Sequence, residues 1–392
     1  MPNAIQKIAI ACQGGGIHAA FGGGVLTEVL RDMEKHKRFD LVGLSGTSAG
    51  GLCAMMAGYG LMPKKSRHGS GSVTEAIQTL NAFWNSFAAS TEIEIAHNAL
   101  CVSLLRMQEQ EVPVLGINMP LIGLNPSGIL AHLTILELEQ FGARKEYYDY
   151  DAMLSAACPE FDDVDWQNVH TRVLLGASEI VDGVETVFDS HCNRGPSGKE
   201  LHFKIEHKWR ARCELTLRGV AASGTIPSVR EAEKIDGRYY WDGLYSQNPP
   251  IREFLAGVPK DKVPDEIWVV RINPQQRPDR TPPKTNVEIR DRENELMSNL
   301  SLNKELDFIL TVNDVIKRPY GVGLTKQYKH VTVRTIKMTK ETAAKLRTSA
   351  KVDRSRNFID GLREEGRQQA LAFLRDWPSD DKNKEYPADA AY

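Results

Sequence analysis

The stretch of sequence that decides the fold runs from Phe39 to Tyr59 and reads FDLVGLSGTSAGGLCAMMAGY. It begins with a short apolar run, typical of a buried strand, and it ends with small apolar residues, typical of a buried helix. Between the two lies the pentapeptide Gly46–Gly50, GTSAG, whose glycines favour a sharp turn. The stretch therefore predicts a strand, a tight turn that carries Ser48, and a helix, in that order.

A similar unit lies just before this stretch. The short apolar run Lys7–Cys12 is followed by glycines at positions 14 to 16 and then, from Ile17 to Lys35, by apolar residues at helical spacing. Two strand–turn–helix units with short connections are typical of α/β proteins with parallel strands. We therefore expect an α/β fold with a mostly parallel central sheet.

The composition excludes several classes of protein. The 49 Lys and Arg residues nearly balance the 51 Asp and Glu residues, and the resulting net charge of −2 argues against a dedicated nucleic-acid binder. No apolar stretch approaches the roughly 18 residues of a membrane-spanning helix, and the apolar run near position 8 is too short for a signal peptide. The six cysteines are scattered singly without metal-ligand spacing, as in proteins that keep reduced thiols. We expect a cytoplasmic protein.

Ser48 is the first candidate for chemistry. The pattern G-x-S-x-G is typical of a nucleophile elbow, in which a serine at a strand-to-helix turn adopts strained backbone angles and its close neighbours must be small. Here those neighbours are Gly46, Thr47, Ala49 and Gly50. The hydroxyl would lie at the N-terminus of a helix, whose dipole favours developing negative charge. The other interpretation of the pentapeptide is a glycine-rich turn without catalysis.

Gly14, Gly15 and Gly16 form the second candidate feature. Consecutive glycines allow backbone N–H groups to converge on an anion, as the oxyanion of an acyl-transfer reaction requires. The same residues also fit the dinucleotide pattern G-x-G-x-x-G/A through Ala19, with Asp40 near the position of a ribose-binding acid. A dinucleotide site does not predict a serine elbow after the second strand, whereas one hydrolase site explains both features.

A nucleophilic serine needs a base. Three Asp-Gly pairs are candidates, and Asp182 and Asp236 each lie between two strand-like runs, where a type I′ hairpin turn is the better interpretation. Asp242 instead follows the strand-like run 238–241 and leads into a loop, where functional residues of open α/β sheets gather. A hydrolase order of serine, acid and histidine would require a histidine after Asp242, and the chain offers only His330, in a strand-like run.

Together these motifs resemble the patatin-like phospholipase family, close to its bacterial branch. Gly14–Ala19 resembles the family's glycine-rich oxyanion motif, and Gly46–Gly50 resembles its nucleophile elbow. Asp242–Leu244 resembles the family's Asp-Gly-Gly/Ala motif, and the run 221–227 (AASGTIP) resembles the small-residue run ahead of that aspartate. The chain departs from the family at His18, where Arg or Lys is frequent, and at Leu244, where Gly or Ala is usual.

The resemblance implies a three-layer α/β/α fold and a serine lipid acyl hydrolase of the phospholipase A type. It implies a catalytic dyad of Ser48 and Asp242 without histidine, an oxyanion hole built from the glycine loop 14–16, and no need for a metal or a cofactor. Because an ordinary carboxylate is a poor base at neutral pH, we expect Asp242 to be partly buried, with a pKa raised by desolvation. The partners would be a lipid or acyl-ester substrate and, peripherally, a membrane surface.

Two alternatives stay open. The first is a generic carboxylesterase that acts on short acyl esters with Ser48 and His330. The second is a non-catalytic module that binds a nucleotide or a lipid and merely keeps the glycine loop. Two measurements distinguish the lipid hydrolase from these two alternatives. They are the turnover of an acyl ester and the effect on turnover of substituting each candidate base.

The resemblance covers about residues 5–275, which we expect to form the catalytic domain. It includes an apolar, proline-containing insertion at about 95–125, which is either a lid that receives an acyl chain or touches a bilayer, or an ordinary packed insertion. Residues 276–377 are expected to form a mainly helical extension packed on this core, and the polar stretch 378–392 a frayed tail.

Overall fold

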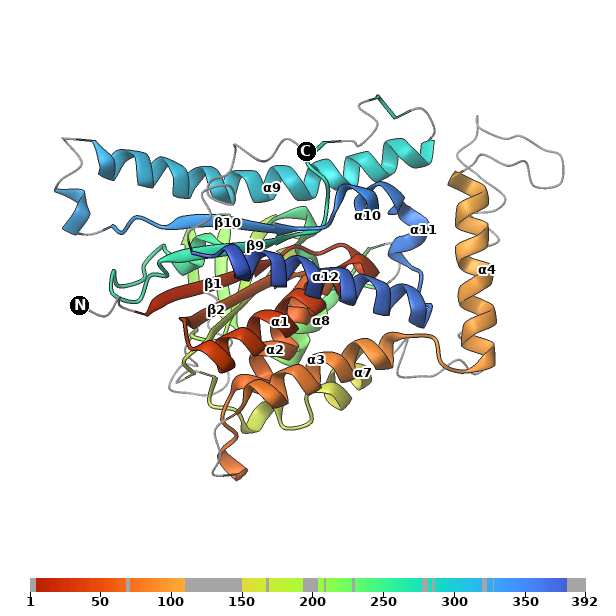
Figure 1. The fold of residues 1–392 in the computed structure, drawn as a ribbon, viewed down its shortest axis with the longest axis horizontal. Coiled ribbons are helices and arrows are strands. Elements are labelled where there is room, and N and C mark those ends of the chain that lie inside the picture. Colours follow the sequence, from red (N-terminus) through yellow and green to blue (C-terminus); the bar gives the residue numbers. More distant parts are fainter. Residues whose placement is uncertain are drawn as a thin grey trace.

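A central mixed sheet organises the structure, a computed structural model (Figure 1). The described residues are 5–67, 71–109, 150–166, 169–192, 204–207, 209–227, 230–276, 281–283, 286–318, 323–326 and 328–378. Within them, the strand order is β10-β9-β1-β2-β3-β4-β6-β5, and β8 joins the sheet by pairing with β3 and β7. The strands are β1 Gln6–Cys12, β2 Phe39–Thr47, β3 Arg172–Glu179, β4 Val184–Asp189, β5 Lys204–His207, β6 Arg210–Glu214, β7 Glu233–Ile235, β8 Arg238–Asp242, β9 Glu266–Arg271 and β10 Thr332–Lys337.

The half of the sheet that contains β1 is parallel. Strands β10, β9, β1, β2 and β3 all run in the same direction, so their carboxyl ends meet at one edge. Beyond β3 the sheet is mixed, because β4 and β8 both run antiparallel to β3. The predicted α/β fold with a mostly parallel sheet is confirmed.

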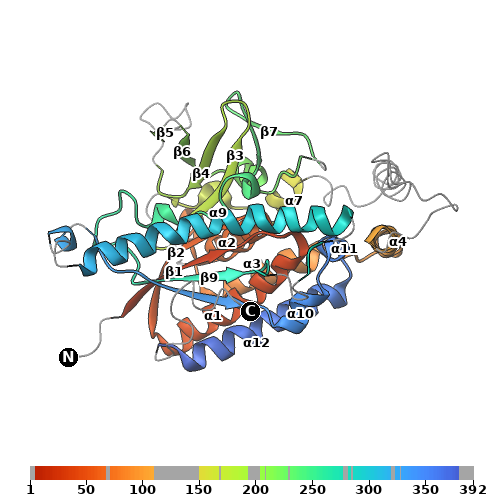
Figure 2. The same cartoon turned by 90° about the horizontal axis from the view of Figure 1, so that it is seen from above.

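Helices cover both faces of the parallel half of the sheet and give three layers. Helices α1 and α12 lie on one face, and the long helix α9 lies across the other (Figures 1 and 2). The helices are α1 Ala20–His36, α2 Ser48–Leu61, α3 Val73–Phe87, α4 Glu92–Glu109, α7 Tyr150–Ala157, α8 Leu217–Ser223, α9 Asn286–Lys317, α10 Lys340–Lys345, α11 Thr348–Lys351 and α12 Arg356–Asp376.

The side chains of β1 are buried alternately on the two faces of the sheet, which explains why helices cover both faces. Ile8 and Ile10 belong to the apolar cluster under α1, α2 and α12, whereas Ala9 and Ala11 belong to a second cluster that includes Leu302 of α9. Successive strand residues point to opposite faces, so a strand buried on both sides is a continuous apolar run. The run of apolar residues in β1 therefore places it in the middle of the sheet, between β2 and β9.

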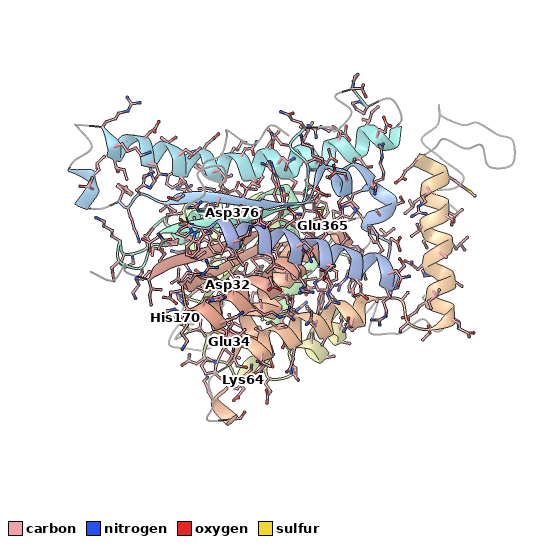
Figure 3. The ribbon with its side chains drawn as sticks, viewed as in Figure 1. Asp32, Glu34, Lys64, His170, Glu365 and Asp376 are labelled. Atoms are coloured by element: carbon pink, nitrogen blue, oxygen red, sulfur yellow. The ribbon has the colours of Figure 1, made fainter. Side chains whose placement is uncertain are left out.

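The C-terminal part of the chain is built into these layers. Strand β10 pairs with β9, and Gly366 of α12 packs so closely on the Phe21 backbone that a Cβ there would collide with it. Glu365 of α12 accepts a hydrogen bond from the Thr339 N–H at the start of α10 (2.9 Å; Figure 3). The mainly helical character predicted for 276–377 is confirmed, and the division of the chain at residue 275 stays a prediction.

The two hairpins predicted at Asp-Gly pairs have different turns. Asp236 and Gly237 join β7 to β8 with φ of 49° and 79°, the left-handed backbone that a type I′ turn requires. The loop between β3 and β4 is longer, and of its residues Gly183 has a positive φ (67°), so this turn is not of type I′. The prediction of a hairpin at Asp182 is confirmed, but the predicted type of turn is wrong.

The apolar insertion predicted at 95–125 divides between two regions. Residues 95–109 belong to α4, which stands beside the main body in both cartoons (Figures 1 and 2), and 110–125 lie outside the described residues. Most of the predicted polar tail 378–392 also lies outside them. Among the helices that are described, none combines the length and the apolar character needed to cross a membrane.

Candidate active site

Ser48 is the first residue of α2 and follows β2 directly. Its φ is 55°, a left-handed backbone conformation that is strained for any residue with a side chain. The turn is tight: a Cβ at Gly50 would lie 2.5 Å from the carbonyl oxygens of Cys12 and Gln13, and one at Gly46 would collide with the Gly50 carbonyl oxygen. The backbone around Ser48 thus has the geometry of a nucleophile elbow, which only small neighbours permit.

Asp242 is the last residue of β8, and its side chain lies beside Ser48. In the antiparallel pairing of β8 with β3, Asp242 lies opposite Ala177, next to the carboxyl end of β2. The carboxyl accepts a hydrogen bond from the Ser48 side chain and another from the Leu244 N–H (2.8 Å). Ser48 and Asp242 are far apart in the sequence, and the sheet brings them into contact.

Burial changes the acidity of Asp242. The residue is only 1 % exposed, and loss of hydration raises the pKa of its carboxyl to about 7, while hydrogen bonds from Ser48 and from the Leu244 N–H act in the opposite direction. A carboxylate with this pKa is a much stronger base than an ordinary aspartate and is still ionised in half of the molecules at neutral pH.

The small-residue run 221–227 holds both members of the pair. The Ser48 N–H donates to the Ser223 hydroxyl (3.2 Å), and the Asp242 N–H donates to the Thr225 carbonyl (2.8 Å). The Thr225 hydroxyl in turn donates to the Ala221 carbonyl at the end of α8 (2.9 Å). Because these side chains are short, the run fits between the elbow and the end of β8 and fixes their separation.

The glycine loop lies against the elbow. A Cβ at Gly14 would be 2.8 Å from Cβ of Ser48 and would collide with the Thr47 carbonyl oxygen. The Gly14 N–H donates to the side-chain oxygen of Asn248 (2.6 Å). Among the described residues, the N–H groups of Gly15 and Gly16 have no acceptor.

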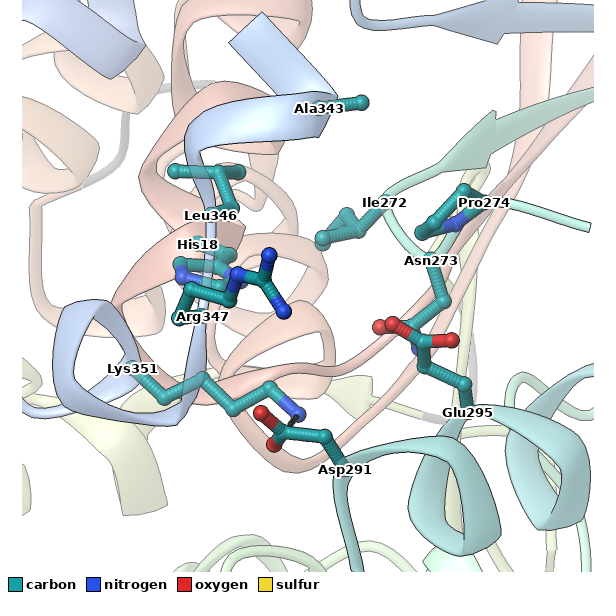
Figure 4. A pocket seen from close by; sticks show the side chains of 10 residues that line it. All are labelled: His18, Ile272, Asn273, Pro274, Asp291, Glu295, Ala343, Leu346, Arg347 and Lys351. Atoms are coloured by element: carbon teal, nitrogen blue, oxygen red, sulfur yellow. Dashed lines mark ion pairs between the residues drawn. The ribbon is translucent and has the colours of Figure 1, made fainter. Parts of the chain in front are cut away.

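His18 is not a source of positive charge beside this loop. Burial lowers the pKa of its ring to about 3, so the ring is neutral at physiological pH. Figure 4 shows His18 at a small cavity next to Lys351, which forms an ion pair with Asp291 (3.6 Å), and Arg347. The cations near the loop therefore come from α11 and the residue before it, not from the glycine motif.

The structure shows why the loop after Asp242 accommodates Leu244 where the family usually has Gly or Ala. The position contributes its backbone N–H to Asp242, and its φ is not among the positive values of the described residues. A side chain is therefore compatible with the backbone of the loop, and the Leu244 side chain is half-buried.

The other candidate bases lie elsewhere. His330 is exposed and precedes β10, whereas Ser48 follows the carboxyl end of β2, so the two lie near opposite edges of the parallel sheet. Six residues of strand separate His330 from the level of Gly46, which corresponds to roughly 20 Å. Asp182 and Asp236 lie in hairpin turns. The structure therefore brings Asp242, and none of these three, to Ser48.

Buried polar residues behind the glycine loop were not singled out by sequence reasoning. They are Gln13, Asn248, Asn273 and Ser298, and they are joined by hydrogen bonds of 2.8–3.0 Å. Asn248 follows the Asp242 motif and offered a weak signal, since it precedes two prolines. Ser298 carried no signal, because a serine within a long polar helix resembles any solvated position.

Comparison with known proteins gives one family. The protein-family model described as "Patatin-like phospholipase" matches residues 10–255, more than half of the chain. No match is found among curated proteins.

Two solved structures are similar at low scores. The crystal structure of VipD from Legionella pneumophila has 9 % identity and a TM-score of 0.38, over 97 % of this chain and 67 % of that one. The type III effector protein ExoU has 12 % identity and a TM-score of 0.30, over 95 % of this chain and 53 % of that one. The chain thus spans about two thirds and about half of these two proteins, and scores this low support no inference about it.

Proposed function

The chain belongs to the patatin-like phospholipase family, which supports a lipid acyl hydrolase in general, and from this premise we propose that it cleaves carboxylic esters of lipids with a dyad of Ser48 and Asp242. One observation carries the proposal: a serine with a strained backbone donates a hydrogen bond to a buried carboxyl whose pKa is raised to about 7. Serine alone is a weak nucleophile, and an adjacent base of suitable pKa activates it.

In the first half of the reaction Ser48 Oγ attacks the ester carbonyl. The Asp242 carboxylate accepts the hydroxyl proton as the new carbon–oxygen bond forms. The tetrahedral intermediate then collapses, the bond to the leaving alcohol breaks, and Asp242 returns the proton to that alcohol. The acyl group remains on Ser48 as an ester.

In the second half water replaces the alcohol. Asp242 accepts a proton from the water as its oxygen attacks the acyl carbon. Collapse of the second tetrahedral intermediate releases the fatty acid, and Ser48 Oγ recovers its proton from Asp242. The buried carboxyl supports both steps, since it gains and loses a proton near neutral pH.

The oxyanion of each intermediate would be held by the N–H groups of Gly15 and Gly16, next to the N-terminus of α2. Both donors are backbone groups of a loop packed against Ser48. Fixed donors of this kind stabilise charge that exists only in the transition state and the intermediate, so they raise the rate of the chemical steps. In this proposal Gly14 shapes the loop through Asn248.

The lipid surface would be met by α4. Ile93, Leu100 and Met107 recur at a spacing of seven residues, lie on one side of the helix and are 43–56 % exposed. An exposed apolar stripe supports peripheral contact with an acyl chain or a bilayer. All six cysteines are free thiols, which supports a reducing, cytoplasmic location.

Hydrolysis of p-nitrophenyl acyl esters of increasing chain length, together with labelling by a serine-directed fluorophosphonate, tests the proposal. We expect Ser48→Ala to abolish both turnover and labelling, and Asp242→Asn to abolish turnover, while His330→Ala retains it. Loss of turnover in His330→Ala with activity retained in Asp242→Asn would replace the dyad by a serine–histidine esterase. Absence of labelling and turnover in the unmodified protein would leave a binding module.

A further inference from the structure

Three buried side-chain amides behind the glycine loop converge on one hydroxyl. Ser298 Oγ, in the first half of α9, lies within hydrogen-bond distance of Gln13 Nε2 (2.9 Å), Asn248 Nδ2 (2.8 Å) and Asn273 Nδ2 (3.0 Å). All four side chains are buried, and Ser298 itself is fully inaccessible to solvent. A hydroxyl oxygen has two lone pairs, so two of these amides, Gln13 and Asn248, are enough to use both.

Backbone groups fix the orientation of two of these amides. Asn248 uses its oxygen to accept from the Gly14 N–H (2.6 Å), so its nitrogen faces Ser298. Gln13 uses its oxygen to accept from the N–H groups of Ile272 and Asn273 (2.9 Å each), so its nitrogen also faces Ser298. Each amide therefore joins a loop that borders the glycine motif to the same point on α9.

We propose that Ser298 is a positioning residue for the oxyanion loop, an inference that rests on the proposed function. Its hydroxyl holds Asn248 in the orientation that anchors Gly14, and it holds Gln13, the residue that enters the loop. Gly15 and Gly16 come directly after these two held residues, Gln13 and Gly14. The positions of the Gly15 and Gly16 N–H groups therefore depend on the hydrogen bonds of Gln13 and Asn248 to Ser298. Ser298 lies beyond residue 255, where the match to the family ends, and thus the C-terminal part of the chain completes the site.

The position of the anchor decides which kinetic constant it affects. The donors of an oxyanion hole contribute mainly when charge develops on the carbonyl oxygen, and a misplaced donor therefore lowers kcat more than it raises KM. The Asp242 carboxyl is held by other groups, the Leu244 N–H and the run 221–227, so the ionisation that controls the pH profile stays unchanged. A lower kcat with an unchanged pH profile therefore indicates displacement of the loop, and not damage to the whole fold.

Asn313 provides a matched control on the same helix. Its buried amide makes two hydrogen bonds to the backbone of Val331, at 2.8 and 3.0 Å, and it lies four turns further along α9. Asn313→Ala therefore removes buried hydrogen bonds from α9 without touching the glycine loop. We expect it to lower stability and to leave kcat per active site within about twofold of the original protein.

The experiment measures kcat, KM and the pH midpoint of p-nitrophenyl butyrate hydrolysis by the full chain, with active sites counted by complete fluorophosphonate labelling. For Ser298→Ala we expect kcat per labelled site to fall about 10- to 100-fold, because an ångström of misplacement has effects of this size. KM should change much less than kcat, and the pH midpoint should remain unchanged. Ser298→Cys keeps a weak acceptor at the same place, so its kcat per labelled site should lie between those of the original protein and Ser298→Ala.

The results distinguish this inference from the proposed function. If the original protein is neither labelled nor active, the proposed function fails. If the original protein is active and the labelled fraction of Ser298→Ala has the same kcat, the positioning role is refuted. Where Ser298→Ala yields no folded protein, an unchanged kcat in Ser298→Cys refutes it equally.

Discussion

Replacing Asp242 by asparagine is expected to abolish ester hydrolysis and, at alkaline pH, to stabilise the folded protein. The side chain is buried, and its ionised form is favoured by hydrogen bonds from Ser48 and from the Leu244 N–H, which do not offset the loss of hydration. Asparagine has nearly the same shape, carries no charge, and keeps an oxygen that can accept from Leu244. The substitution therefore removes the burial of a charge and little else.

The magnitude follows from the pKa of Asp242. Burial moves it from 3.8 in the unfolded chain to about 7 in the folded protein. A raised acid pKa means that the folded state binds the proton more tightly, so stability falls as the pH rises from about 4 to about 7. At about 1.4 kcal/mol per unit, the raised pKa costs roughly 4 kcal/mol of stability above pH 7 and roughly 1.5 kcal/mol at pH 5.

Urea unfolding at pH 5 and pH 8 measures this cost. We expect Asp242→Asn to gain roughly 1.5 kcal/mol of unfolding free energy at pH 5 and roughly 4 kcal/mol at pH 8. Asp189→Asn is the control of opposite sign: despite its burial, hydrogen bonds and charge interactions with Arg172 lower the pKa of Asp189. That substitution should destabilise the protein by the same amount at pH 5 and at pH 8, because both pH values lie above the unfolded pKa of 3.8 and the stabilising effect of a lowered acid pKa is lost only below it. An Asp242→Asn variant with the same stability difference at both pH values would refute the reasoning.

Three further predictions follow from the same geometry. Because the pKa of Asp242 is about 7, kcat/KM for a p-nitrophenyl ester should rise about tenfold between pH 6 and pH 8, as a pH–rate profile would measure. Gly50→Ala should cost at least 3 kcal/mol, or about 4 °C or more in Tm for a chain of 392 residues, because its Cβ would lie 2.5 Å from two backbone oxygens. Leu100→Glu together with Met107→Glu should reduce hydrolysis of phosphatidylcholine vesicles at least tenfold, and should leave p-nitrophenyl butyrate turnover unchanged, since charge on an apolar stripe opposes contact with lipid.

Each of these three predictions has a control or a result that would contradict it. A flat profile between pH 6 and 8 would contradict a base with a raised pKa. Gly183→Ala is the control for Gly50→Ala, since a Cβ there meets no neighbour and only its φ of 67° opposes the change; an equal loss in both would refute close packing at the elbow. For the stripe on α4, Val181→Glu alters another exposed apolar residue, 70 % accessible, in the β3–β4 turn. If that change reduces vesicle hydrolysis as much, α4 is not the lipid-facing element.

The part of the site that the sequence predicted is the part encoded by neighbouring residues. Ser48, its small neighbours and the strand before it form one contiguous unit, so spacing alone predicts the turn. Asp242 was recognisable because it ends a strand and precedes a loop. A buried carboxyl with a raised pKa is what chemistry predicts for a base at this position, and Asp242 is buried with a pKa raised by desolvation.

The rest of the site depends on long-range packing, which no local pattern contains. Gln13 and Ser298 are 285 residues apart in the chain, and neither has a partner within its own segment that would mark it. The role of Gly14 also depends on a distant residue, since Asn248 occupies its N–H and leaves Gly15 and Gly16 as donors. The type of the turn at Asp182 was predicted wrongly for a related reason, because strand pairing set the loop length after the Asp-Gly pair had suggested a shorter one.

The place of β1 between β2 and β9 has a consequence for synthesis. Ile8 of β1 pairs with Glu266 of β9, so during synthesis on a ribosome β1 emerges long before its neighbour β9. Ser298 emerges later still, and with it the last anchor of the glycine loop. A nascent chain that already contains both Ser48 and Asp242 is then expected to hydrolyse esters poorly until α9 has been released. The proposed hydrolase activity would in this way begin only after the whole core has been translated.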